Sequence, residues 1–516
     1  MFSSIQSYID FLERKGELLR IKEYVDPDCE IAEITSRYCN SVGEKKALLF
    51  ENTGKKIKVL TNIYGSEMSL KYIFNAPSID SIRTRFEEFI EKDKISEDTG
   101  RFRKLKHLFR ELRELKYYPR YIKSTPPCQE SIQYTAKLFD LPFLTHYSSD
   151  AGPCMYDAIV FSTDPDTGQR NIESVPIQIL SNKTIAILAN NLSNIRKHLD
   201  RATHVLPIAI CIGGNPILHF LSKTNVNLDK MALLGYLRQY PALMTKCITQ
   251  DINIPADSDI VIEGYIHKSS ERIKAGPLSS VFGVSKYTEN CPVMNVTCIT
   301  HRSDAILPMT NSSHLWSAYN SFNKMTEIFI TELFKRTNFQ VIINISLPAE
   351  GFGQNILIVK IKKYNPIQPK IMANEIWSSN QFASNKFLIF VGEDANINET
   401  EEFARYIAAR VNPNRDIYQS QGIINKNFSL NSDDASGARM MIDATNSPEH
   451  PEYRFGDVFQ ITFDDTFAGE EKVMDNHDKL RAISFFVDVE KDCRISNNKL
   501  IIDARNKYGS GAKVCV

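Results

Sequence analysis

The stretch GQRNIESVPIQ, residues 168–178, carries the side chains that most invite a chemical interpretation. It follows the turn TDPDTG, so it is expected to be the second strand of a β-hairpin. Glu173 could deliver a proton, and on an alternating strand it shares a face with Val175 and lies opposite Pro176. Pro176 has no backbone N–H and no polar side chain. The segment therefore offers one candidate acid next to a position without polar chemistry.

Other reactive side chains occur without the partners that a catalytic site requires. His301 ends an apolar run and precedes Arg302, which favours a strand-end residue over a general base. Asp433 and Asp434 lie in a polar loop, where solvation is expected. The sequence contains no phosphate-binding loop, dinucleotide fingerprint, HExxH zinc motif or GxSxG nucleophile elbow. The residues alone therefore indicate no particular reaction.

Composition indicates an ordinary globular protein of several domains. The chain has 516 residues, so two or three domains are expected. Hydrophobic residues make up 42% and charged residues 24% of the sequence. Lys and Arg number 62 and Asp and Glu also number 62, so the formal net charge is zero. No overall field favours nucleic acid or an anionic membrane.

The cysteines and the first residues bear on location. Ten cysteines are scattered without a C-x-x-C pair, which favours buried free thiols over a disulfide framework or a zinc site. The start, MFSSIQSYIDFLERKGE, lacks the layout of a signal peptide, and no apolar run is long enough to span a bilayer. We therefore expect a cytoplasmic protein with no membrane span.

Changes in hydrophobic periodicity divide the chain into four parts, which together predict an α+β fold. Residues 1–123 predict an α/β layer and a linker helix, and 124–320 predict short strands joined by tight turns, as in an antiparallel barrel or sandwich. Strands alternate with helices in 321–446, which indicates a second α/β domain, and 447–516 form an appended β-rich tail.

Residues 101–123, RFRKLKHLFRELRELKYYPRYIK, are the one strongly biased segment, with nine Arg and Lys against two Glu. A nucleic-acid-binding arm is one interpretation. An amphipathic linker helix is preferred, because no aromatic or glycine motif accompanies the basic residues. We expect one continuous helix with its leucine face buried.

Nine short strings occur in the order expected for UbiD-like decarboxylases: YIDFLERKGELLRI, VDPDCEIAEI, ALLFEN, PPCQE, TDPDTGQRN, KCITQDINIPADSDIVIEGYI, LPAEG, VNPNRD and MIDATN. The chain thus resembles the UbiD family of prenylated-FMN-dependent carboxy-lyases from its first helix to about residue 446. The resemblance implies an N-terminal α/β layer, a central split antiparallel β-barrel of the flavin-reductase-like type, and a C-terminal α/β domain that helps to assemble oligomers.

The chemistry implied by the resemblance is decarboxylation on a flavin. Prenylated FMN bonds covalently to an aromatic or α,β-unsaturated acid and serves as the electron sink while carbon dioxide leaves. An arginine holds the substrate carboxylate, and a carboxylic acid protonates the carbanion. Manganese ties the cofactor phosphate to the protein through Asn, His and Glu.

Several of these family positions differ here. The family strand motif N-x-G-x-Y-R-x-Q keeps Asn171 and Gln178, but Pro176 stands at the arginine. The Asp-Glu pair of the family falls on Ser317 and Ala318. The catalytic residues of this chain are therefore unknown.

Further positions around the implied site also depart from the family. Glu173 replaces the glycine of the strand motif and Val175 replaces the tyrosine. The acid-bearing loop reads AGPLSS at residues 275–280. Residues 192–194, LSN, stand where the histidine ligand should fall, and His198 lies about one helical turn further on.

Three residues correspond to binding positions of the family. Asn171 stands at the asparagine ligand, Asp259 replaces the glutamate ligand, and Arg439 stands where the family has a lysine near the phosphate. The resemblance thus implies Asn171, Asp259 and Arg439 as residues that bind the cofactor. Asn171 and Asp259 would be the manganese ligands.

Three interpretations of function stay open. A carboxy-lyase with displaced catalytic groups predicts flavin absorbance in the purified protein. A non-catalytic paralogue that acts as a scaffold, or as the partner of an active subunit, predicts a colourless protein. A nucleic-acid-binding protein that uses the basic helix predicts salt-dependent binding. A homo-oligomer is expected from the resemblance.

Overall fold

The computed structural model describes residues 2, 4–41, 45–93, 117–190, 192–224, 229–279, 285–310, 315–336, 339–348, 351, 355–379, 381–423, 436–446, 493–496, 499–503 and 513–515. The chain forms two compact units, Met1–Asn446 and Ser447–Val516. Within the described ranges, no helix combines the length and the apolar character needed to cross a membrane.

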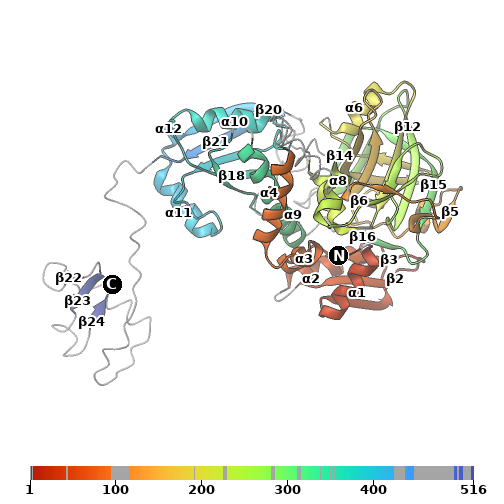
Figure 1. Ribbon diagram of the computed structural model, residues 1–516, viewed down its shortest axis with the longest axis horizontal. Helices are drawn as coiled ribbons and strands as arrows, with labels where there is room; N and C mark the ends of the chain where they lie inside the picture. Colours follow the sequence, from red (N-terminus) through yellow and green to blue (C-terminus); the bar gives the residue numbers. More distant parts are fainter. Residues whose placement is uncertain are drawn as a thin grey trace, which may run out of the picture. The chain divides into compact units, whose positions relative to one another are not determined.

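An α/β layer begins the first unit (Figure 1). Its helices are α1 (Ile5–Lys15), α2 (Glu30–Asn40), α3 (Glu67–Ile73) and α4 (Ile79–Asp93). Its sheet has the order β1 (Leu18–Tyr24), β2 (Ala47–Asn52), β3 (Lys58–Thr61) and β16 (Ile306–Met309). Helix α1 forms as its apolar spacing predicts, because Ser4 caps its first turn and Gly16 ends it at a φ of 72°. Strand β16 follows the barrel in sequence, so it ties the barrel to this layer.

A closed antiparallel barrel of six strands follows. Its strands are β6 (Cys154–Thr163), β7 (Arg170–Ser181), β8 (Thr184–Ile187), β9 (Val205–Ile212), β12 (Ile260–His267) and β15 (Val293–His301). The order is β12-β9-β6-β7-β8-β15, and pairing of β12 with β15 closes the ring. Strand β5 (Ser131–Gln133) adds to the edge of β15. Closure pairs each barrel strand on both sides over part of its length, and β5 covers a part of β15 that the short β8 does not reach.

Alternation along the barrel strands feeds two hydrophobic cores. Val160 and Ile210 point into a core inside the barrel. Phe161 and Ala209, next to them in sequence, join a second core that the barrel shares with the N-terminal layer and the C-terminal domain. Successive side chains of a strand face opposite sides, so one strand can serve both cores.

Short elements surround the barrel. They are the helices α6 (Asn194–Arg201), α7 (Pro216–Lys223) and α8 (Lys230–Leu237), the 3₁₀ turns η3 (Pro127–Gln129) and η4 (Leu138–Asp140), and the strands β4 (Arg120–Tyr121), β10 (Leu243–Lys246), β11 (Asn253–Pro255), β13 (Ile273–Ser279) and β14 (Ser285–Cys291). Helix α6 lies across one end of the barrel (Figure 1), where Ile195 and Leu199 join the barrel core.

A mixed five-stranded sheet completes the first unit. Its order is β17 (Ile342–Ser346), β18 (Ile356–Ile361), β19 (Phe387–Val391), β21 (Ser436–Ala444) and β20 (Ile417–Ile423). Its helices are α9 (Leu315–Arg336), α10 (Gln368–Ser378), α11 (Thr400–Arg410) and α12 (Pro413–Asp416). Helix α9 packs on α4 of the N-terminal layer, where the rings of Phe86 and Phe329 lie 4.6 Å apart. The second unit contains the antiparallel strands β22 (Cys493–Ser496), β23 (Lys499–Asp503) and β24 (Lys513–Cys515).

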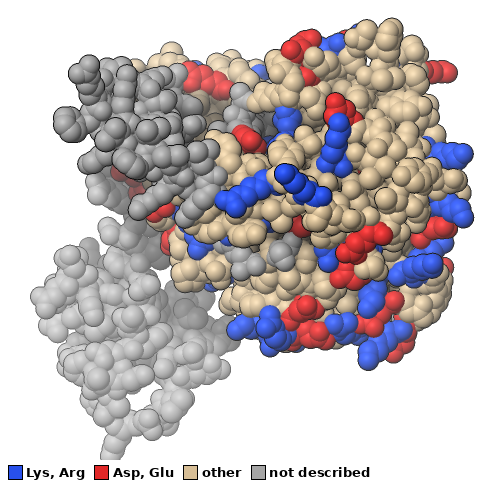
Figure 2. Space-filling view, turned by 45° about the vertical axis from the view of Figure 1, so that its right-hand side comes forward, with Lys and Arg blue, Asp and Glu red and all other residues tan. Residues whose placement is uncertain are grey.

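The predicted fold class is confirmed: an α/β layer, a central antiparallel barrel and a C-terminal α/β domain. The finer boundaries of the four-part division stay predictions, because residues up to Asn446 pack as one unit. Most of the predicted linker helix, through residue 116, lies outside the described residues; the prediction is wrong for its last residues, because Arg120–Tyr121 form β4. On the face drawn in Figure 2, basic and acidic side chains are interspersed.

The barrel core gives a test of this architecture. We expect Ile210→Ala to lower the free energy of unfolding by about 2–5 kcal/mol, because Ile210 is fully buried inside the barrel. Ile132→Ala in β5 is the matched control, since Ile132 is 41% exposed; its effect should stay within about 0.5 kcal/mol. Urea unfolding measures both, and equal losses would contradict the assignment of Ile210 to the core.

Candidate functional site at the end of the barrel

Strand β7 carries the candidate residues toward helix α6. In the β6–β7 hairpin, Asn171 pairs with Ser162 and Glu173 pairs with Val160, whose side chain lies in the barrel core. Asn171 and Glu173 therefore continue the inner face of the barrel to its open end. Val175 lies on the same face, as strand alternation predicts, and is buried in that core.

Glu173 binds the first turn of α6. Its carboxylate accepts hydrogen bonds from the backbone N–H groups of Asn194 (3.1 Å) and Ile195 (3.0 Å), and from the Ser193 hydroxyl. The first N–H groups of a helix lack partners within the helix and carry a partial positive charge, so a carboxylate here is favourable. The candidate acid of the sequence is thus engaged in capping a helix.

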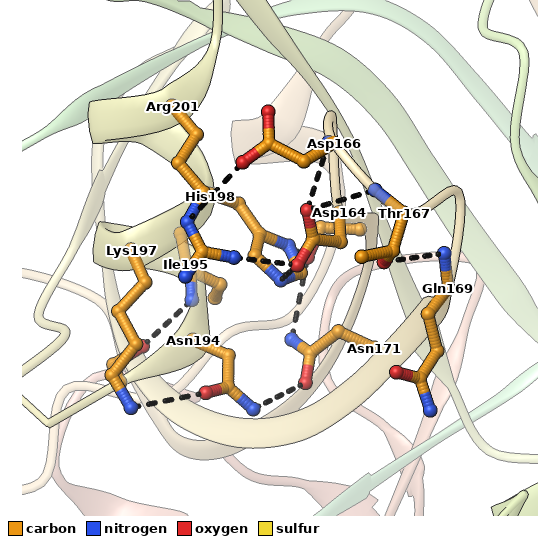
Figure 3. A network of polar contacts seen from close by, with 12 residues as sticks. Asp164, Asp166, Thr167, Gln169, Asn171, Asn194, Ile195, Lys197, His198 and Arg201 are labelled. Atoms are coloured by element: carbon orange, nitrogen blue, oxygen red, sulfur yellow. Dashed lines mark hydrogen bonds and ion pairs between the residues drawn. The ribbon is translucent and has the colours of Figure 1, made fainter.

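A hydrogen-bonded chain of polar side chains runs from α6 back to the hairpin turn (Figure 3). The Asn194 amide donates to Asn171 Oδ1 (3.1 Å), and Asn171 Nδ2 donates to Ser162 Oγ (3.3 Å). Ser162 Oγ lies 3.0 Å from His198 Nδ1. Because this hydroxyl accepts from Asn171, it is free to donate to Nδ1, which leaves the proton of a neutral imidazole on Nε2. Burial lowers the pKa of His198, which favours that neutral form.

The far end of this chain is fixed by the hairpin turn. His198 Nε2 faces Asp164 at 3.8 Å, and Arg201 pairs with the same carboxylate at 2.7 Å. Asp164 also accepts from the backbone N–H groups of Asp166 and Thr167, and these turn contacts come first among the causes that lower its pKa. The network fixes the position of α6 on the barrel.

Lys230 brings a buried positive charge to the same strand. It is the first residue of α8, is 9% exposed, and donates from Nζ to the carbonyl oxygen of Ile172 at 2.6 Å. Burial lowers its pKa to about 8, and the Glu173 carboxylate opposes that shift. Lys230 stays mostly protonated at neutral pH. Lys230 was not anticipated, since no sequence pattern sets this lysine apart.

The family positions that the resemblance implies for catalysis lie on strand β7 and near the start of helix α9. Pro176 lies on β7, where its carbonyl oxygen accepts from Leu188 N–H (2.9 Å). Gln178 accepts from the backbone N–H of Gly276 at 2.8 Å, which joins β7 to β13; residues 275–279, expected as a loop, are part of that strand. Ser317 and Ala318 lie near the start of α9, and their side chains are outside the described residues.

The three residues implied for cofactor binding lie in separate networks. Asp259 is buried and accepts from the N–H groups of Gly214 (2.8 Å) and Ile306 (3.3 Å). Burial raises its pKa to about 7. The Arg439 guanidinium stacks on Trp377 at 4.5 Å in the C-terminal domain.

Asn171 and Asp259, the two manganese ligands that the resemblance implies, have separate hydrogen-bond partners in this structure. Their hydrogen bonds, within the described part of the chain, share no residue. Nor do three His, Cys, Asp or Glu side chains gather into a metal-binding group within that part. Metal binding by Asn171 and Asp259 stays a prediction that this geometry does not favour.

A second polar cluster was not anticipated from the sequence. Asp157 of β6 lies 2.7 Å from His219 Nε2 and 3.5 Å from Lys223 Nζ, both on α7. Tyr64 of the N-terminal layer lies 3.0 Å from His219 Nδ1. Asp157, His219 and Tyr64 border a cavity of about 30 Å³, room for one or two water molecules. They come from segments far apart in the sequence, so spacing could not reveal them.

A β-bulge explains how Asp157 reaches this cluster. Met155 pairs with Ile177 and Ala158 pairs with Val175, so Tyr156 and Asp157 together face Pro176. Met155 and Ala158 both point into the barrel core. The extra residue turns Asp157 outward, toward α7 and the N-terminal layer.

Three family models match the chain in succession. They describe the N-terminal domain of 3-octaprenyl-4-hydroxybenzoate carboxy-lyase over residues 9–89, its Rift-related domain over 120–314 and its C-terminal domain over 321–444. The order and the extent of these matches follow the three parts of the fold. The chain belongs to the UbiD family.

Similar proteins span nearly the same length. An uncharacterized protein of Aquifex aeolicus is 28% identical over 450 residues, which cover 86% of this chain and 92% of its own. The UbiD-class enzyme HmfF of Pelotomaculum thermopropionicum, solved with FMN, has a TM-score of 0.70 and 23% identity, covering 94% of this chain and 100% of its own. Vanillic acid decarboxylase of Sedimentibacter hydroxybenzoicus in closed form has a TM-score of 0.75 and 22% identity, covering 94% and 99%. At such identities these structures establish the shared fold.

The Asp157 cluster predicts a defined dependence of stability on pH. Burial acts to raise the pKa of Asp157, but the charges of His219 and Lys223 outweigh it and hold the pKa below its ordinary value. The ionised carboxylate therefore contributes stability above about pH 4, the range of the unfolded-state pKa, and loses it as the pH falls through the folded-state pKa.

Asp157→Asn should accordingly lower the free energy of unfolding at pH 7 by about 3–5 kcal/mol, since it removes the buried carboxylate that contacts both His219 and Lys223. The difference from wild type should shrink below about pH 4. Urea unfolding at pH 7 and pH 3 measures it. Asp166→Asn, at an exposed turn residue, should change little at either pH. A loss that is the same at both pH values would contradict the prediction.

Proposed function

We propose that this UbiD-family protein does not perform the standard decarboxylation and acts as a scaffold, or as the non-catalytic partner of an active paralogous subunit. The observation that carries the proposal is Pro176 on β7, at the position where the family has the arginine that grips the substrate carboxylate. Proline has neither charge nor donor. The substrate carboxylate would have no partner at this position.

The protonation step lacks its acid as well. The Asp-Glu positions of the family hold Ser317 and Ala318; a serine hydroxyl is far too weak an acid, and alanine has no exchangeable side-chain proton. Glu173 is bound to the first turn of α6 and points to the face opposite Pro176. Loss of a single group of this kind costs on the order of a hundredfold in rate or more. Because both the carboxylate-binding arginine and the proton-donating acid are replaced, we expect this protein not to catalyse the decarboxylation.

Cofactor retention is proposed to be weak for the same reason. HmfF was solved with FMN and, in an evolved dimeric form, with prenylated FMN. When bound, prenylated FMN supplies the electron sink for decarboxylation. In this chain Asn171 hydrogen-bonds to Asn194, Asp259 to backbone N–H groups, and Arg439 stacks on Trp377. None of these contacts supports a joint site for manganese and a flavin phosphate.

One observation favours the alternative of a carboxy-lyase with displaced groups. Asp157 and His219 border a cavity together with Tyr64, and an Asp–His pair can move a proton to or from a bound group. Turnover that is abolished by Asp157→Asn, in a variant shown to be folded, would support this alternative.

The turnover assay tests the proposal directly. Protein reconstituted with prenylated FMN, manganese and potassium is incubated with cinnamate-like and hydroxybenzoate-like acids, and products are followed by mass spectrometry. We expect no decarboxylation and no deuterium exchange into the matching products, because carboxylate binding and protonation both lack their residues. An active UbiD-class decarboxylase prepared in parallel controls for the reconstitution. Measurable turnover by this chain would refute the proposal.

Assembly gives an independent test. We expect at least a dimer, since a scaffold or partner subunit acts through association and a net charge of zero does not oppose it. Light scattering at micromolar concentration measures the mass of the pure protein. Native mass spectrometry after co-expression with a paralogue that keeps the arginine and the acids detects mixed oligomers. A strict monomer in both experiments would rule out the partner role.

A further inference from the structure

We infer that this chain has replaced a ligand at the α6 end of the barrel by two of its own charges. The Glu173 carboxylate takes the place of an anion on the first turn of α6, and the Lys230 ammonium takes the place of a cation beside β7. The inference deepens the proposed function, since it explains why manganese and a phosphate would not be held there. It rests on the contacts that Glu173, Lys230 and Asn171 make.

The anion position is filled by Glu173. The first turn of a helix is a general site for phosphate and carboxylate groups, because its N–H groups point outward without partners in the helix. Here the N–H groups of Asn194 and Ile195 and the hydroxyl of Ser193 all donate to one carboxylate. A phosphate would have to displace Glu173 to reach the same donors.

The cation position is filled by Lys230. Its ammonium is buried, donates to the Ile172 carbonyl oxygen at 2.6 Å, and interacts electrostatically with Glu173. A buried ammonium needs an opposite charge and acceptors close by. Glu173 and the carbonyl next to Asn171 supply these. A divalent ion brought here would be repelled by the lysine.

Asn171, the third group at this end of the barrel, is also engaged in hydrogen bonds within the chain. A metal would need Asn171 Oδ1, because the amide nitrogen has no free lone pair. That oxygen accepts from Asn194, while Asn171 Nδ2 donates to Ser162. Asn194 is itself neutral and lies within the range 192–194, where the resemblance implies a histidine ligand. The manganese site implied by the family therefore does not fit this set of residues.

A plain structural role for Glu173 and Lys230 would also explain their contacts, because Glu173 stabilises the docking of α6 on β7 and Lys230 that of α8. The two explanations differ in what happens when Lys230 changes sign. If the lysine stands in for a cation, Lys230→Glu places a second carboxylate beside Glu173 and Asn171, and a divalent ion becomes the favoured occupant. If the role is structural alone, the variant is destabilised and gains no metal.

The experiment measures manganese binding to the full-length protein by electron paramagnetic resonance titration, with thermal unfolding recorded with and without MnCl₂. We expect no stoichiometric manganese site in the wild type. Lys230→Glu should gain affinity by roughly tenfold or more, and manganese should raise its unfolding temperature. Lys268→Glu is the matched control: Lys268 also bonds backbone carbonyls, those of Asp200 and Ala202 near the end of α6, and it should gain no manganese.

Two results would overturn the inference. One is stoichiometric manganese binding by the wild type. The other is a folded Lys230→Glu that gains no more manganese affinity than Lys268→Glu. If Lys230→Glu does not fold without metal, refolding with MnCl₂ decides: recovery of folded protein supports the inference, and failure in both manganese and magnesium contradicts it. Manganese binding by the wild type leaves the turnover assay unaffected, so failure of the inference and failure of the proposed function are distinguishable.

Discussion

Closure of the six-stranded ring by β12 and β15 is the constraint on which the rest of the molecule depends. In a closed ring, each strand turns one face of side chains to the inside of the barrel and the other face to the outside. Side chains of the inner face join one core, which also contains N-terminal-layer residues such as Leu48 and Phe50, and those of the outer face join a second core with the N-terminal layer and the C-terminal domain. The two polar clusters of the candidate site accordingly lie at one end of the ring and at a bulge in strand β6.

At the end of the barrel that α6 covers, the free-energy cost of burying the Lys230 ammonium is offset by neighbouring groups. A buried ammonium without a partner would be unstable, and so would a helix end without acceptors. Glu173 satisfies both, since it accepts from the first turn of α6 and interacts with Lys230. The polar chain from Asn194 to Asp164 then fixes the other contacts of α6. Among the residues that the structure describes at this end, Asn171, Glu173, His198 and Lys230 all have partners within the chain, which is the reverse of what an open binding site requires.

The elements that depend on local sequence pattern could be predicted, and the contacts between residues far apart in the sequence could not. The spacing of Ile5, Tyr8, Ile9 and Leu12 predicted α1, and strand alternation placed Glu173 and Val175 on one face. Hairpin turns and short strands predicted the antiparallel barrel, although its closure needed the pairing of β12 with β15. Asn194 contacts Asn171 only because α6 lies across the barrel end. Lys230, which contacts Ile172 of the same strand, belongs to a third segment, helix α8. No spacing rule joins residues at such separations.

Pro176 shows how a substitution at a reactive position can be accommodated by the strand beside it. A proline inside a barrel strand removes a ladder hydrogen bond, so it is tolerated chiefly at edges and bulges. Here Tyr156 and Asp157 of β6 together face Pro176 in a bulge, where the regular ladder is already interrupted. The same bulge turns Asp157 outward to His219 and Lys223. Pro176, at the position where the resemblance implies an arginine, and Asp157, at the centre of the second polar cluster, thus depend on one irregularity of the barrel. A change that restores regular pairing at residue 176 would also move Asp157.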